Sequence, residues 1–105
     1  MAIPRTIKVG PHVYSVVRKT EEEMPDALGD TDFDANEIRI RKNMSKTKSQ
    51  EILLHELLHA CTYPSVTGAY EGEEKFMAEE FVNAVAPVLL QVLKDNPKLV
   101  EYLIE

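Results

Sequence analysis

The chain has 105 residues, of which 44% are hydrophobic and 29% are charged, a balance typical of one globular domain rather than a disordered chain. Its net charge of −6 argues against a general nucleic-acid surface, because such surfaces neutralise phosphates with lysine and arginine. The N-terminal residues contain no apolar signal segment, and no window approaches the apolar length of a membrane span. We therefore expect a single domain, residues 1–105, in a cytoplasmic protein that binds neither nucleic acid nor membrane.

The first part of the chain is predicted to form a small sheet. Residues 6–17 are rich in β-branched and aromatic side chains on both sides of Gly10-Pro11, which predicts two short strands. A polar loop is expected over residues 18–30. The alternation in residues 37–41 then predicts the second strand of a hairpin, with Ile38 and Ile40 buried on one face. Because the other face of this strand is charged, we place it at or near an edge of the sheet.

Helices are predicted in the second half. Residues 45–61 are apolar nearly all round the helical wheel, which is typical of a central helix. Residues 63–68 contain proline and glycine and are expected to form a connection. A long helix rich in carboxylates follows from about Glu71, with a kink at Pro87. Residues 98–104 are expected to form a last short helix.

The predicted central helix contains His55-Glu56-Leu57-Leu58-His59. Histidines four residues apart project from one face of a helix, so both imidazoles can reach one ion. Glu56 lies roughly 100° further round, too far to be a natural third ligand but close enough to contact a water held by the metal. The order His-Glu-x-x-His is that of the zinc peptidases, with the glutamate as general base. The alternative is that both histidines are ordinary core or interface residues.

A third zinc ligand must come from elsewhere in the chain. We do not expect it from His12, at the predicted strand turn, or from Cys61, since a free cysteine is usually buried. Helical periodicity alone favours Glu74, whereas Glu79 borders the apolar face of its helix and Glu80 lies further round. The candidate carboxylates are Glu71, Glu73, Glu74, Glu79 and Glu80.

HELLH followed by a glutamate on a later helix resembles the gluzincin type of zinc peptidase. Residues 29–40 followed by ILLHELLHA are similar to the small ImmA/IrrE-like peptidases of phages and prophages, in which a strand carrying I-x-I precedes the histidine helix. Their second helix has a pattern like E-x-x-A-N-x-F-A. In this chain Glu79, Val82, Asn83 and Ala86 stand at positions one, four, five and eight, while the aromatic is not reproduced.

The resemblance covers roughly residues 29–97 and implies an α+β, minimal zincin-like fold. In such a fold a small antiparallel or mixed sheet packs on the histidine helix and on a long glutamate helix. The resemblance implies one Zn²⁺ per chain, held by His55, His59 and Glu79. Glu56 would be the catalytic base of an endopeptidase that acts on protein or peptide substrates.

Known relatives attack regulatory proteins in the cell, so an intracellular regulatory protein is the substrate that kinship suggests. Peptidases of this design hold the substrate as an extended strand along a sheet edge. The strand of Arg39 and Ile40 is a candidate for that role as well as for a plain sheet edge. Two other interpretations stay open: a catalytically silent zinc-binding interaction protein of phage or prophage origin, and a metal-free interaction domain.

Overall fold

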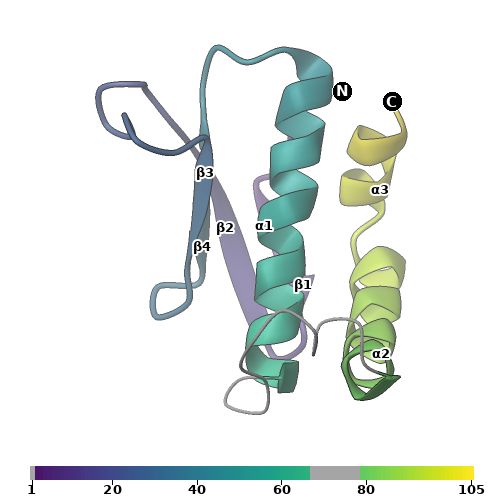
Figure 1. The fold of residues 1–105 in the computed structure, drawn as a ribbon. Coiled ribbons are helices and arrows are strands. Elements are labelled where there is room, and N and C mark those ends of the chain that lie inside the picture. The colour runs from purple at the N-terminus through teal and green to yellow at the C-terminus, as the bar shows by residue number, and fades with distance from the viewer. Residues whose placement is uncertain (1, 67–78) are drawn as a thin grey trace.

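The structure is a computed structural model that describes residues 2–66 and 79–105, with side chains for residues 2–62 and 83–105. The strands come first and the helices follow, which is the order of an α+β domain (Figure 1). The described elements are β1 (Thr6–Val9), β2 (His12–Lys19), β3 (Gly29–Asp32), β4 (Glu37–Arg41), α1 (Lys46–Val66), α2 (Glu79–Asp95) and α3 (Pro97–Ile104).

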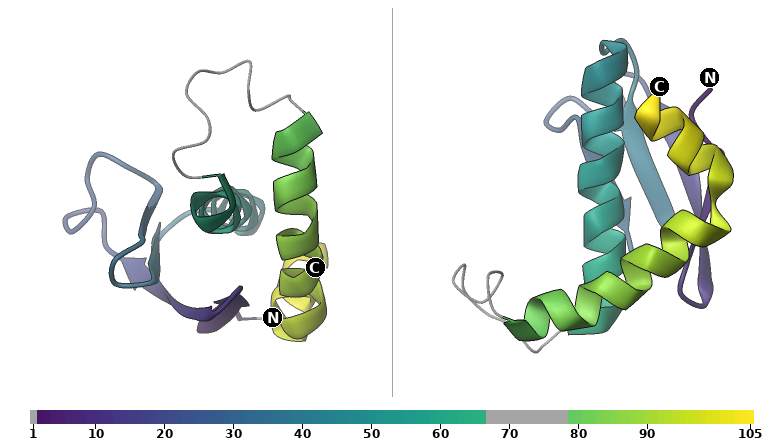
Figure 2. Two further views of the ribbon diagram at one scale, coloured as in Figure 1. Left: turned by 90° about the horizontal axis from the view of Figure 1, so that it is seen from below. Right: turned by 90° about the vertical axis from the view of Figure 1, so that its right-hand side faces the viewer.

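The four strands form one mixed sheet with the order β1-β2-β4-β3. β1 and β2 are antiparallel, β2 and β4 are parallel, and β3 and β4 are antiparallel. α1, α2 and α3 lie on the same side of the sheet (Figure 2). The α+β class and the small mixed sheet predicted from the sequence are therefore confirmed.

The predicted strand pairs are present. β1 and β2 meet at a turn in which Gly10 has a φ of +57°, a conformation that glycine adopts without steric cost. In the β3–β4 hairpin, Ile38 and Ile40 are fully buried, as predicted.

The strand of Arg39 and Ile40 lies near an edge of the sheet, as predicted, but it is not itself an edge strand. β4 is an interior strand, bonded to β2 on one side and to β3 on the other. The charged side chains of β4 lie on the face of the sheet that the described helices leave uncovered. On that face Arg39 Nε donates to Asp30 Oδ1 at 2.5 Å. The alternation of apolar and charged residues therefore identified which face of β4 is exposed, but it did not identify the position of β4 in the strand order.

Helix α1 is longer and less buried than predicted. Ser45 Oγ accepts a hydrogen bond from the Lys48 backbone N–H, which satisfies one of the unpaired donors of the first turn. The helix then continues to Val66, so the expected connection does not begin at residue 63. Leu54 and Leu58 are 42% and 39% exposed, which shows that α1 is not buried all round.

The core lies between the sheet and the helices. α1 contributes Leu53, Leu57, Ala60 and Cys61, each fully buried, and the strands and later helices supply the rest of the described core. The short final helix was predicted correctly, and Pro87 lies inside α2. The predicted start of the long helix near Glu71 lies outside the described residues. None of the helices in the described part of the chain has the length and apolar character that crossing a bilayer requires.

Asn96, between α2 and α3, ties the helices to the outer edge of β1. Its Oδ1 accepts from the Lys8 backbone N–H at 2.9 Å, and its Nδ2 donates to the Lys8 and Val92 carbonyls at 3.0 and 2.7 Å. Gln91 adds a bond from Nε2 to the Lys8 carbonyl and accepts one from the Gly10 N–H at Oε1. Side chains thus take the place of a further strand along β1.

We expect Asn96→Ala to lower the free energy of unfolding by about 1–3 kcal/mol, because it removes the side-chain partner of the part-buried Lys8 N–H and C=O groups and a buried bond to the Val92 carbonyl. The matched control is Gln91→Ala, which removes bonds to the same strand at an exposed site, where water replaces them, and should cost less than about 0.5 kcal/mol. Urea denaturation measures both values. Equal losses for the two variants would contradict the importance of burial at Asn96.

Candidate metal centre

The imidazoles of His55 and His59 face each other on the exposed side of α1. Their Nε2 atoms are 3.2 Å apart, and the rings meet edge to face with centroids 4.8 Å apart and planes at 72°. The His55 side chain is 63% exposed. The pair is therefore open to solvent and is not part of a sealed interior.

The separation of the two nitrogens fits a tetrahedral zinc ion. Two ligands at about 2.0–2.1 Å from the metal and at the tetrahedral angle are about 3.3 Å apart, close to the 3.2 Å between these Nε2 atoms. Imidazole nitrogen is also a donor that suits zinc. The same distance allows one N–H···N bond between two rings in opposite tautomers. Metal analysis separates these two interpretations.

Glu56 lies on a different side of α1 from the exposed rings and is only 6% exposed. Its Oε1 accepts a hydrogen bond from Thr31 Oγ1 at 2.9 Å. Its Oε2 lies 4.0 Å from His55 Nε2. One carboxylate oxygen is thus held by the sheet, while the other faces the histidine pair.

These groups line an open cavity of about 360 Å³ between α1 and the β3–β4 hairpin. α1 contributes His55, Glu56 and His59, and the hairpin contributes Gly29, Asp30, Thr31 and Phe33. The motif identified the α1 side of this cavity, but the hairpin side was not predicted. No sequence pattern marked these residues. The strand register explains their place, since Gly29 and Thr31 pair with Ile40 and Ile38 and so share their helix-facing side.

Gly29 allows β3 to approach α1 closely at this point. A Cβ atom at residue 29 would lie 2.6 Å from Ile52 Cγ2, 3.1 Å from the Arg39 carbonyl oxygen and 3.3 Å from Glu56 Cγ. The first distance is too short for any side chain, and Ile52 is β-branched and stiff at χ1. The absence of a side chain at Gly29 therefore brings the strand into contact with the helix beside Glu56.

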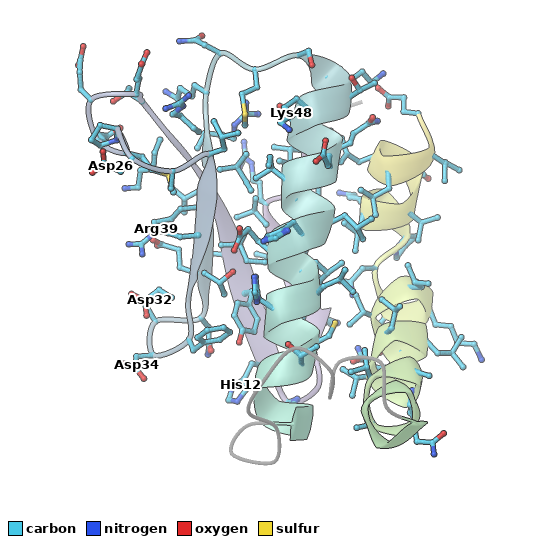
Figure 3. All side chains as sticks on the ribbon, viewed as in Figure 1. His12, Asp26, Asp32, Asp34, Arg39 and Lys48 are labelled. Carbon is cyan, nitrogen blue, oxygen red and sulfur yellow. The ribbon has the colours of Figure 1, made fainter. Side chains whose placement is uncertain are left out.

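Charged residues of the hairpin also pair with one another. Hydrogen bonding to Asp30 raises the pKa of Arg39. Asp32 Oδ1 accepts from the backbone N–H groups of Asp34 and Ala35 in the turn. Figure 3 shows Arg39 and Asp32 on the side of the hairpin away from α1, so these two side chains lie apart from the histidine pair.

Among the side chains that the structure describes, no third His, Cys, Asp or Glu joins His55 and His59 in a group that could hold a metal. His12 is instead near Asn36, with 3.4 Å between its Nδ1 and the amide nitrogen. Cys61 is fully buried, which confirms the prediction for it, and burial raises the pKa of its thiol to about 11. Neither residue belongs to the candidate centre.

The predicted third ligand, Glu79, is the first residue of α2, and its side chain lies outside the described residues. The same holds for the side chain of Glu80, whereas Glu71, Glu73 and Glu74 lie outside the described backbone as well. α2 begins at the end of the molecule where α1 ends (Figures 1 and 2). The choice among these carboxylates stays a prediction.

No family model, curated protein or solved structure matches this chain.

We expect the purified protein to bind about one zinc ion per chain, and His55→Ala or His59→Ala to reduce this to less than about a tenth, because each removes one of two converging donors. The matched control is His12→Ala, which should leave the stoichiometry unchanged. Metal content after dialysis measures it. Full zinc retention without either ring would show that the pair is not a ligand set.

The third ligand is tested in the same assay with single alanine substitutions. Glu79→Ala should weaken zinc binding by a factor of about 10 or more, since it removes a charged oxygen donor. Glu74→Ala and Glu80→Ala are the matched controls on neighbouring carboxylates. A loss confined to one of these controls would move the assignment to that residue.

We expect Gly29→Ala to lower the free energy of unfolding by about 1–3 kcal/mol, because the new methyl overlaps Ile52 and forces strand and helix apart. The control is Gly29→Ala combined with Ile52→Ala, which removes the overlapping methyl and should recover part of the loss beyond the cost of Ile52→Ala alone. Thermal denaturation measures all three variants. Strictly additive losses would contradict the steric explanation.

Proposed function

We propose that this chain is a zinc-dependent endopeptidase with a minimal zincin-like fold. His55, His59 and Glu79 are the proposed zinc ligands, and Glu56 is the proposed catalytic base. One observation carries the proposal: two imidazole nitrogens 3.2 Å apart and a carboxylate oxygen 4.0 Å from one of them converge in an open cavity. The His-Glu-x-x-His motif assigns matching roles, with the two histidines as zinc ligands and the glutamate as general base.

When bound, zinc would polarise the scissile carbonyl and lower the pKa of a coordinated water towards about 7. The protein supplies the proton transfer. Glu56 Oε2 would accept a proton from the attacking water and pass it to the nitrogen of the leaving amine. The C–O bond forms as Glu56 takes the proton from the water, and the C–N bond breaks as that proton reaches the amine nitrogen, so the carboxylate returns to its starting state.

An extended substrate would lie along β3, in place of the strand of Arg39 and Ile40 expected from the sequence. β3 is an outer strand of the sheet, and Gly29, Asp30 and Thr31 line the cavity. The opposite edge, β1, is closed by Asn96 and Gln91. The backbone of an added peptide could therefore pair with β3 while its scissile bond lies beside α1.

The proposed substrate is a protein or peptide. The resemblance to the ImmA/IrrE-like peptidases suggests an intracellular regulatory protein as the candidate, and the cytoplasm is the proposed location. The exposed pair Leu54 and Leu58 lies on the same helix as the histidines. These apolar side chains are compatible with a polypeptide substrate, which offers apolar groups as well as a peptide bond.

We expect Glu56→Gln to lower kcat for peptide cleavage by about 100-fold or more while zinc stays bound, because the amide cannot accept the proton. Cleavage of unstructured proteins and a mixed peptide library, followed by mass spectrometry, measures it. The matched control is Glu51→Gln, an exposed glutamate on the same helix, which should keep full activity.

Equal activity in Glu56→Gln and the unchanged protein would exclude Glu56 as the base and point to a contaminating protease. A zinc-loaded protein that cleaves nothing in the panel would favour the silent zinc-binding alternative. A protein that binds no zinc would favour the metal-free interaction domain.

A further inference from the structure

Thr31 connects the edge strand of the sheet to Glu56. Its place in the strand register, opposite the fully buried Ile38, puts its side chain on the helix-facing side of β3. There Oγ1 lies 2.9 Å from Glu56 Oε1 and 3.4 Å from the Glu56 backbone carbonyl. Because Thr31 is β-branched, few χ1 rotamers are open to this hydroxyl.

The hydroxyl has one proton, so it donates fully to one of these two acceptors. The carboxylate oxygen is both closer and charged, and bonds to a charged acceptor are roughly twice as strong as neutral ones. We therefore assign the proton of Thr31 to Glu56 Oε1. The backbone carbonyl of Glu56 already belongs to the hydrogen-bond ladder of α1.

This bond fixes a torsion that packing alone leaves loose. The last torsion of a glutamate side chain is broad and roughly two-fold, so burial of the stem does not determine where the two oxygens point. With Oε1 held by Thr31, Oε2 is the oxygen that lies 4.0 Å from His55 Nε2. The two oxygens of one carboxylate thus have different partners.

We propose that Thr31 is a positioning residue for the reaction: it binds Oε1 of Glu56 and so keeps Oε2 directed towards the histidine pair and the attacking water. Gly29, two residues earlier on β3, makes the contact possible because it lets the strand approach Glu56 Cγ. This inference rests on the proposed peptidase function and adds a residue that the motif does not contain.

The first test separates a positioning role from a purely structural one. Thr31→Val keeps the shape of the side chain and removes the hydroxyl, so kcat should fall about 10-fold or more while KM changes less than about two-fold and zinc content does not change. Thr31→Ser restores the hydroxyl and should recover activity to within about three-fold. The matched control is Thr6→Val, at an exposed position of β1, which should leave kcat unchanged.

The second test needs neither activity nor metal. In the metal-free protein, Thr31→Val should lower the melting temperature by several degrees, because it leaves a buried carboxylate oxygen of Glu56 without the hydroxyl donor of Thr31. In a Glu56→Ala background the same substitution should shift the melting temperature by less than about 1 °C, since no carboxylate remains to be satisfied.

Additive shifts in the melting temperature would show that no Thr31–Glu56 bond exists and would overturn the proposal. Coupled shifts together with an unchanged kcat in Thr31→Val would reduce Thr31 to a stabilising contact, and would overturn its positioning role while the proposed function stands. Coupled shifts in a protein that cleaves nothing would overturn both the proposed peptidase function and the positioning role of Thr31. The hydrogen bond between Thr31 and Glu56 would still stand.

Discussion

The candidate site depends on the close contact between the edge strand β3 and helix α1. Gly29 leaves no room for a side chain against Ile52, and Thr31 bonds to Glu56 two residues further along the strand. The strand thus reaches the helix at two helix-facing positions in succession. This contact turns Glu56 from an exposed glutamate into a buried carboxylate with one bonded oxygen, which is the condition for a defined direction of the other.

Residues of the five-residue motif differ in burial, because α1 packs on the sheet along one side only. His55 and His59 lie on the exposed side, where solvent, a metal or a substrate can reach them, while Glu56 and Leu57 face inward. Proton transfer by a base requires both accessibility of the reacting group and a fixed position for the carboxylate. The boundary between helix and hairpin supplies both within one turn of α1.

The two edges of the sheet differ for a related reason. Along β1, Asn96 and Gln91 bond to the backbone of Lys8 and Gly10, so a further strand would have to displace side chains that also hold the helical layer. β3 contacts α1 through its side chains, and Gly29, which has no side chain, lets the strand come close to the helix. Within residues 2–66 and 79–105, β3 is paired with another strand on one side only, and the outer side of such a strand can pair with an added strand.

The sequence by itself determined the α+β class, the hairpins and the one-turn spacing of His55 and His59, because strand alternation and helical repeat are local properties. It could not determine that β4 is interior, since a charged face looks the same at an edge and in a one-sided sheet, or that Leu54 and Leu58 are exposed, since burial depends on what packs outside the helix. Thr31 and Gly29 were equally invisible: they lie 25 and 27 positions before Glu56. Only tertiary packing decides which of the oxygens on a glutamate finds a hydroxyl, because that contact joins two elements whose local patterns carry no information about each other.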